Sequence, residues 1–311
     1  MINTVTLNPA IDKMLYLNNF KKNTTNRIQN IETTIGGKGT HVSINLKQMN
    51  ENSNAFGICH GETGTKIIEM LQSSGINVHF IHEDEFQSRT NYLLVEESGD
   101  CTIVAEKGVL LAPKSLERLI ADMGHTIQNQ DFLVLSGDAS NCEDPMIYNK
   151  LLSGLRAKNL KVFLDTSGET LPLCIKESPF LIKPNLDELS ALCGHPVAPN
   201  DRDIIAAIHS LAPYHIQIIA VSLGEGGSII QAPGGIYRAY PPKVRVANTI
   251  GCGDCFLAGF VSGVSRGEPI EEIIRWATAV SAATAESRSS VGFRPERARE
   301  LASLVKIIKL D

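Results

Sequence analysis

Short apolar runs alternate along this chain with helix-length amphipathic segments. The runs at residues 5–7, 55–59, 132–136, 162–165, 180–183 and 216–222 lack polar alternation, as expected of strands buried on both faces. Helical periodicity marks residues 41–49, 63–73, 145–158 and 201–211, and in the first of these Val42, Leu46 and Met49 share one face. The pattern predicts an α/β fold in which helices flank a central, mostly parallel sheet on both faces.

Two segments interrupt this alternation. Residues 14–17, and later 91–95 with 101–104, have strand character but no helix between them, which predicts a small antiparallel sheet separate from the main one. Each segment leaves a main-sheet strand and returns to a helix. We therefore expect a lid, built from about residues 12–35 and 88–107, across the strand ends where ligands bind.

The remaining segments and the absence of a linker complete the expected architecture. We expect a strand at residues 243–246 and helices over 271–287 and 295–309, from β-branched runs and amphipathic periodicity respectively. No repeat, low-complexity tract or Pro/Gly/Ser-rich linker divides the chain. Residues 1–311 should therefore form a single α/β domain carrying the lid.

Charge and cysteine content restrict the partners and the compartment. Lys and Arg number 29 against 34 Asp and Glu, for a net charge of −5, and they are scattered. This distribution argues against nucleic acid and membrane surfaces as partners. No apolar run reaches membrane-spanning length, and the first residues resemble a strand rather than a secretion signal. Seven cysteines, an odd number, indicate reduced thiols and hence a cytoplasmic protein.

The motif Asn-Thr-Ile-Gly-Cys-Gly-Asp at residues 248–254 follows the expected strand and leads into an apolar helix. Unpaired N–H groups at such a helix start attract an anion. Asp254 would repel that anion, so it suits phosphoryl transfer, in which a hydroxyl beside the phosphate must lose its proton. A helix-capping Asp after a glycine turn explains the motif equally well.

Three further motifs each have a functional and a structural interpretation. Residues 35–39, Ile-Gly-Gly-Lys-Gly, offer an anion site without the spacing of a Walker loop, or a simple turn. In Lys-Pro-Asn-Leu-Asp-Glu at residues 183–188, Asn185 and Glu188 could position Mg²⁺ through its waters, or cap a helix. Residues 221–227, Val-Ser-Leu-Gly-Glu-Gly-Gly, suit either a nucleotide or a hairpin turn.

Two arginines and two cysteines are further candidates for site residues. Arg27 and Arg89 lie in or beside the lid segments, where they could hold a phosphate or simply be solvated. Cys252 and Cys255 form a C-x-x-C pair without a second pair or nearby histidines, so packing is favoured over zinc binding. A helix N-terminus can lower a thiol pKa, so oxidation sensitivity is a hypothesis.

Taken together and in order, these motifs resemble the PfkB carbohydrate kinases, a ribokinase-like family. They look most similar to its 1-phosphofructokinase and tagatose-6-phosphate kinase branch, over nearly the whole chain. The matching segments are residues 6–12, 36–39, 165–168, 183–188, 221–224 and 248–254.

The resemblance implies a ribokinase-like domain that binds MgATP and a sugar across the strand ends. Asp254 would be the general base, and the backbone of Gly251, Cys252 and Gly253 would hold the charge on the transferred phosphoryl group. The implied nucleotide-binding residues are Lys183, Asn185, Glu188, Ser222, Gly224, Gly227 and Thr249. Asn185 and Glu188 would also hold Mg²⁺, most simply through water.

The sugar side of the implied site departs from the family pattern. Asp12 would hold sugar hydroxyls, Gly37 and Lys38 would line the pocket, and Arg27 and Arg89 would bind the substrate phosphate. His41 stands where the family usually has Asn, and its ring can still hydrogen-bond a hydroxyl. Asp138 stands in Ser-Gly-Asp-Ala-Ser, where Ser-Gly-Ser-Leu-Pro is usual. An anion there costs phosphate binding unless a basic residue compensates.

The predicted activity is ATP- and Mg²⁺-dependent phosphorylation of a phosphorylated ketohexose, giving a bisphosphate. Fructose 1-phosphate and tagatose 6-phosphate are the leading acceptors. The alternatives are a kinase for an unphosphorylated sugar or nucleoside, which Asp138 and His41 favour, and a binding regulator without catalysis, which the retained Asp254 disfavours. Exposed lid strands could pair between subunits, so a homodimer through the lid is a further expectation.

Overall fold

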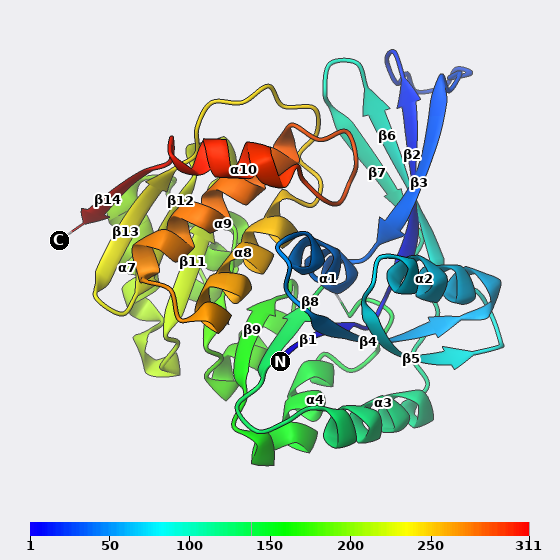
Figure 1. Cartoon of the computed structure of the whole chain (residues 1–311), viewed down its shortest axis with the longest axis horizontal. Coiled ribbons are helices and arrows are strands. Elements are labelled where there is room, and N and C mark those ends of the chain that lie inside the picture. The colour runs from blue at the N-terminus through cyan, green and yellow to red at the C-terminus, as the bar shows by residue number, and fades with distance from the viewer. Residues whose placement is uncertain (138, 311) are drawn as a thin grey trace.

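The computed structural model describes residues 1–137 and 139–310, and its centre is a large sheet (Figure 1). The sheet has ten strands in the order β14-β13-β12-β11-β10-β9-β8-β1-β4-β5. Neighbours from β11 to β5 pair in parallel, and β12, β13 and β14 add an antiparallel edge. The strands are β1 (Ile2–Thr6), β4 (Ser53–His60), β5 (Asn77–Glu83), β8 (Phe132–Ser136), β9 (Lys161–Asp165), β10 (Leu181–Ile182), β11 (Ile218–Ser222), β12 (Ser228–Ala232), β13 (Gly235–Tyr240) and β14 (Lys306–Leu310). The predicted mostly parallel sheet is confirmed.

The order of the strands reverses between β1 and β8. Ile2 of β1 aligns with Ser53 of β4 on one side and with Phe132 of β8 on the other. The chain winds outward from β1 through β4 to β5, and from β8 through β11 in the opposite direction. The connections that leave β1 and β8 therefore diverge, which opens a crevice at the carboxyl ends of these strands.

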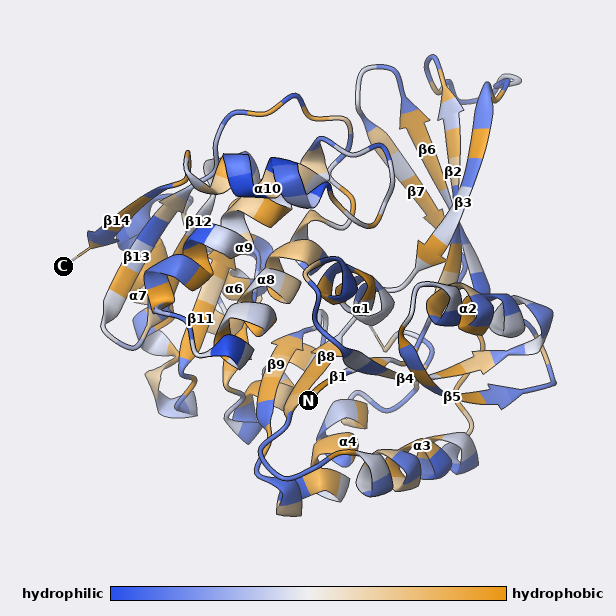
Figure 2. Cartoon of the chain, in the orientation of Figure 1, coloured by the Kyte–Doolittle hydropathy of each residue, from blue (hydrophilic) through white to orange (hydrophobic). Residues whose placement is uncertain are grey.

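Helices cover both faces of the sheet, as the sequence predicts (Figure 1). On one face α1, α8, α9 and α10 pack with the strands into one core, and on the other α3, α4, α6 and α7 pack into a second. Within β8, Val134 belongs to the first core, whereas Leu133 and Leu135 belong to the second, because successive strand side chains alternate between faces. Figure 2 shows the central strands as largely hydrophobic and the outer side of α10 as hydrophilic. The helices are α1 (Lys38–Gln48), α2 (Gly61–Ser73), α3 (Pro113–Thr126), α4 (Ile147–Leu155), α5 (Thr170–Cys174), α6 (Leu186–Cys193), α7 (Asp201–Ser210), α8 (Cys252–Arg266), α9 (Ile270–Ala285) and α10 (Pro295–Ala302).

A separate four-stranded sheet projects from the body (Figure 1). Its order is β3-β2-β6-β7, with β2 at Ala10–Leu17, β3 at Asn30–Gly36, β6 at Arg89–Glu96 and β7 at Cys101–Ala105. The two hairpins are antiparallel, but β2 and β6 pair in parallel, so the sheet is mixed rather than antiparallel as expected. The reason is that β2 and β6 follow β1 and β5, which run in the same direction in the main sheet.

Two predicted elements are wrong. Residues 243–246 form no strand; Arg245 and Val246 are exposed, and no neighbouring strand among the described residues pairs with this segment. The helix expected over residues 295–309 ends at Ala302, and β14 follows it. The β-branched pair Ile307 and Ile308 suits a strand, and β14 pairs with the otherwise open edge of β13.

In the described parts of the chain, residues 1–137 and 139–310, we find no helix whose length and apolar content would let it cross a bilayer.

The contact between α8 and α9 leads to a stability prediction. A Cβ atom added at Gly259 of α8 would lie 2.7 Å from the Cα atom of Ala277 in α9, whereas one added at Gly124 of α3 would have nothing within 4 Å. Gly259→Ala should therefore lower the free energy of unfolding by about 1–3 kcal/mol through overpacking. Gly124→Ala should raise it by about 0.5–1 kcal/mol through helix propensity.

Urea denaturation of the two variants and the wild type measures both changes. Both variants carry the same Gly→Ala substitution. If their free energies of unfolding changed in the same direction, the close packing of α8 on α9 would be contradicted.

Candidate active site

A cavity of about 490 Å³ lies at the carboxyl ends of the central strands, where the strand order reverses. Its walls come from residues after β1, β8, β9 and β10, from the first turns of α1 and α8, and from the small sheet. Ten predicted site residues line it: Asp12, Gly37, Lys38, His41, Arg89, Lys183, Thr249, Gly251, Gly253 and Asp254. Segments far apart in sequence therefore meet at one place, as an open α/β sheet requires of its ligand site.

The start of α8 forms one wall. Gly251 has φ 74°, and a Cβ there would lie 2.1 Å from the carbonyl oxygen of Ser290, so this position needs glycine. Asn248 holds the turn: its Oδ1 accepts the N–H of Ile250 at 2.8 Å, and its Nδ2 donates to the Ser287 carbonyl at 2.6 Å. The turn thus places the start of α8, whose first N–H groups carry partial positive charge, at the wall of the cavity.

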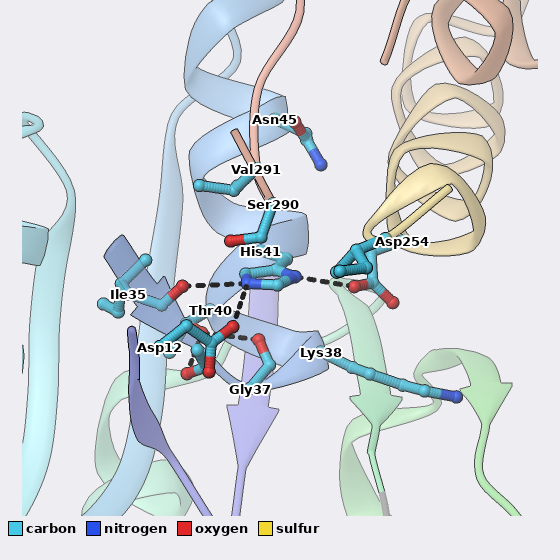
Figure 3. Close-up of polar contacts among 12 residues, drawn as sticks. Asp12, Ile35, Gly37, Lys38, Thr40, His41, Asn45, Asp254, Ser290 and Val291 are labelled. Carbon is cyan, nitrogen blue, oxygen red and sulfur yellow. Dashed lines mark hydrogen bonds and ion pairs between the residues drawn. The ribbon is translucent and has the colours of Figure 1, made fainter. Parts of the chain in front are cut away.

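His41 lies between Asp254 and the small sheet (Figure 3). Its Nδ1 is 2.8 Å from Oδ2 of Asp254, its Nε2 is 2.9 Å from the carbonyl oxygen of Ile35, and Nε2 is also 3.9 Å from Oδ2 of Asp12. Burial lowers the pKa of His41, but the hydrogen bond to Asp254 and the charges of Asp254 and Asp12 outweigh it and raise the pKa overall. Both ring nitrogens have protein partners in this structure, so neither is left over for a sugar hydroxyl.

Asp12 is buried beside a glycine. A Cβ at Gly36 would lie 2.1 Å from Oδ1 of Asp12, so the glycine makes room for this carboxylate. The same oxygen accepts a hydrogen bond of 2.8 Å from Nδ2 of Asn91. Burial raises the pKa of Asp12, and His41 and Asn91 offset this only in part. Sequence reasoning missed Asn91, because only the parallel register of β2 and β6 sets it opposite Asp12.

Asp165 joins two predicted lysines. Its Oδ1 is 3.4 Å from Nζ of Lys38, and its Oδ2 is 3.3 Å from Nζ of Lys183. Burial raises the pKa of Asp165, but the two ammonium charges outweigh it and lower the pKa overall. Sequence reasoning placed Asp165 in a family motif without giving it a role; its position at the end of a buried strand was the available signal.

Several predicted nucleotide residues lie outside the lining of this cavity. Asn185 and Glu188 form a capping box at the start of α6: Oδ1 of Asn185 accepts the Glu188 N–H at 2.8 Å, and Oε2 of Glu188 accepts the Asn185 N–H at 2.9 Å. Ser222 forms a β-bridge with Asn185. Gly224 and Gly227 belong to the turn that joins β11 to the antiparallel β12, as in the hairpin interpretation. Cys252, the first residue of α8, does not line the cavity either.

Of the two arginines predicted to bind the substrate phosphate, only one lines the cavity. Arg89 lines the cavity, and its Nε donates to the carbonyl oxygen of Asn8 at 3.1 Å. Arg27 is exposed in the loop between β2 and β3 and is not part of the lining. Asp138 lies outside the described residues.

The thiols are not activated. Burial, with a smaller contribution from the charge of Asp254, raises the pKa of Cys252 to about 12. Burial also raises the pKa of Cys255, which is fully buried. All seven cysteines, each within the described residues, are free. Burial therefore outweighs the helix N-terminus, and little thiolate is present at neutral pH.

This arrangement suits proton abstraction next to an anion. Oδ2 of Asp254 is held by His41, and none of the hydrogen bonds found among the described residues uses its Oδ1. Lys38, Lys183 and Arg89 supply positive charge around the cavity. No group of three or more His, Cys, Asp or Glu side chains in residues 1–137 and 139–310 could hold a metal ion by itself.

Comparison with known proteins gives a consistent result. A model of "pfkB family carbohydrate kinase" matches residues 5–297. Tagatose-6-phosphate kinase of Staphylococcus epidermidis is 28% identical over 313 residues, covering 100% of both chains. 1-Phosphofructokinase of Borreliella burgdorferi is 31% identical over 286 residues, covering 92% of each. The crystal structure of Escherichia coli phosphofructokinase-2 with substrates and products superimposes with a TM-score of 0.91 at 21% identity, over 97% of this chain and 98% of that one. The expected ribokinase-like fold is confirmed.

The raised thiol pKa predicts low reactivity at the start of α8. Iodoacetamide should modify Cys252 in the folded protein more than about 100-fold more slowly than in the urea-unfolded protein, because the thiolate is the reacting form. Peptide mass spectrometry over time gives both rates. Equal rates in the two states would show that Cys252 is an accessible, ordinary thiol and would revive an oxidation-sensitive role.

Proposed function

The chain belongs to the pfkB family of carbohydrate kinases, and we propose that it transfers the γ-phosphoryl group of ATP to a phosphorylated ketohexose. Fructose 1-phosphate and tagatose 6-phosphate are the proposed acceptors, and the product is a sugar bisphosphate. The named activities of relatives that match 92% or more of this chain support this choice.

The single observation that carries the proposal is the position of Asp254. This carboxylate is buried in the first turn of α8 and faces the cavity at the reversal of strand order. In the proposed reaction Oδ1 of Asp254 takes the proton of the acceptor hydroxyl as its oxygen attacks the γ-phosphorus, and the bond from phosphorus to ADP breaks. The backbone N–H groups of Gly251, Cys252 and Gly253 stabilise the charge on the transferred group.

The nucleotide is proposed to lie along the ends of β10 and β11. Lys183 and Thr249 face the cavity, and Ser222, Gly224 and Gly227 extend the same edge outward. Asn185 and Glu188 fit a Mg²⁺ ion held through water, because their cap uses only one oxygen of the Glu188 carboxylate. When bound, Mg²⁺ would neutralise charge on the nucleotide phosphates.

The acceptor is proposed to lie on the side of the small sheet. Asp12 would accept hydrogen bonds from its hydroxyls beside Gly37, and Arg89 and Lys38 would bind its phosphate. Arg27, exposed outside the cavity lining, gives this chain's cavity one basic residue fewer than expected. That observation favours the second candidate, a kinase for an unphosphorylated sugar or nucleoside.

Free cysteines agree with activity in the cytoplasm.

The first test is the substitution Asp254→Asn. We expect it to lower kcat by about 10²–10⁴-fold, because the amide cannot take the proton. Asp203→Asn is the matched control, since Asp203 is also the third residue of its helix, α7, but is exposed. ATP consumption is measured with fructose 1-phosphate, tagatose 6-phosphate, fructose 6-phosphate, fructose and ribose.

Different results would refute the general base and the recognition of the substrate phosphate. Near wild-type turnover in Asp254→Asn would refute the general base. Turnover only on unphosphorylated sugars would refute phosphate recognition by Arg89 and Lys38.

We also propose that the small sheet, over residues 12–35 and 88–107, is a lid and pairs with the same sheet of a second copy. β3 and β7 are its edge strands, and Ile31 on β3 and Val104 on β7 are each 55% exposed. Figure 2 shows apolar residues along these strands, which stand clear of the body. Burying such apolar edges against a second copy would remove them from water.

Substitution of the lid edge tests the dimer. Ile31→Glu with Val104→Glu should give a monomer in light scattering after size exclusion, because charges would be buried in the shared face. Leu304→Glu, at an apolar position 62% exposed outside the lid, should leave the dimer intact. A monomeric wild type, or a dimer that survives the double substitution, would contradict pairing through the lid.

A further inference from the structure

The ring of His41 faces hydrogen-bond acceptors on both sides (Figure 3). The backbone carbonyl of Ile35 can only accept, so Nε2, 2.9 Å away, carries a proton. At Nδ1, the 2.8 Å contact with Oδ2 of Asp254 requires one proton between the two atoms. That proton is on the imidazole if Asp254 is ionised, and on Asp254 if the imidazole is neutral.

The charges around the ring decide between these two forms. Three titratable side chains are buried together: His41 at 4%, Asp12 at 4% and Asp254 at 6% exposed. Asp12 faces the ring from β2 and Asp254 from α8. Farther out, Arg89 of β6 lies near Asp12, and Lys38 of α1 and the neutral thiol of Cys252 lie near Asp254.

Two carboxylates beside one imidazole favour the cation. Burial opposes any charge on the ring, but the pair of acids outweighs it, and the pKa of His41 is raised. A charge-assisted hydrogen bond is also stronger than a neutral one. His41 is therefore the imidazolium, and its two N–H groups donate to Oδ2 of Asp254 and to the Ile35 carbonyl oxygen.

His41 also connects three parts of the fold. It stands in the first turn of α1, its Nε2 donates to Ile35 in lid strand β3, and its Nδ1 donates to Asp254 in α8. Figure 3 shows the ring between these two partners, with Lys38 extending in another direction. Ring orientation is therefore set by the docking of α1, β3 and α8 together.

We propose that His41 is a positioning residue whose doubly protonated ring clamps Oδ2 of Asp254, aims Oδ1 at the acceptor hydroxyl, and makes turnover fall when the ring loses its proton. The proposal rests on the proposed kinase function and adds a pH limit to it. Loss of a ring proton would leave a lone pair facing either the carboxylate or the Ile35 carbonyl. The ring or Asp254 must then turn away, and the base loses its alignment.

The sign of the pH effect follows from the direction of the shift. A pKa raised in the folded state means that the clamp is complete below the ordinary histidine value of about 6.5 and is lost as pH rises through the higher folded value. The alkaline loss should therefore affect kcat more than KM, because substrate contacts do not involve the ring.

Three variants separate this role from a structural one. His41→Asn keeps an N–H donor that does not titrate, so its kcat should be reduced but should lack the alkaline fall. His41→Leu removes the donor, and kcat should drop by about 10²-fold from misalignment of the base. His125→Asn, at an exposed position in α3, should reproduce the wild-type profile.

The closing experiment pairs these kcat profiles with ¹⁵N NMR of the histidine rings in the unliganded protein. The signal missing in His41→Asn identifies His41, and it should still show two ring protons above pH 6.5. In Asp254→Asn the His41 pKa should fall toward the ordinary value. Because this readout needs no turnover and does not involve His41→Leu, it stands even if that variant does not fold.

The outcomes distinguish the two proposals. Titration of His41 near or below its ordinary pKa, or an alkaline fall in kcat that persists in His41→Asn, would overturn the clamp. An absence of turnover on every acceptor, with a doubly protonated His41, would refute the kinase proposal and leave the His41–Asp254 pair established.

Discussion

The reversal of strand order between β1 and β8 is the constraint on which the site depends. Parallel strands place their carboxyl ends on one edge of the sheet, and only at a reversal do neighbouring connections diverge enough to leave a cavity. Here the connection that leaves β1 leads into β2 of the small sheet, away from β8 on the other side of the reversal. The cavity, the start of α8 and the small sheet therefore meet at one edge because of the winding of the sheet.

The site also depends on buried carboxylates that have polar or charged partners. Asp12, Asp165 and Asp254 are all buried, and an isolated carboxylate in that position would be strongly destabilised. Each has a partner instead: Asn91 for Asp12, Lys38 and Lys183 for Asp165, and His41 for Asp254. Charges held in this way are ready to act on an anionic ligand, since they need little reorganisation on binding.

Much of the fold could be predicted from local sequence pattern, and the predictions that were wrong have a common cause. Apolar runs and helical periods identified the parallel strands other than β5 and most of the flanking helices, though not α3, because burial on two faces or on one stripe leaves a mark in neighbouring residues. Residues 306–310 continued the pattern expected of a helix, but the open edge of β13 made a strand of them. The mixed order of the small sheet likewise followed from the direction in which β1 and β5 run.

For the site, the sequence by itself determined the glycine turn before Asp254, the family motifs and their order, since these are encoded in short contiguous stretches. Only the tertiary structure decided which of those residues share the cavity, that Arg27 stays outside it, and that Asn91 and Asp165 join it. It alone set His41 against Asp254, 213 residues away. A pair of that separation depends on how α1 and α8 dock on the sheet, and no spacing along the chain records that distance.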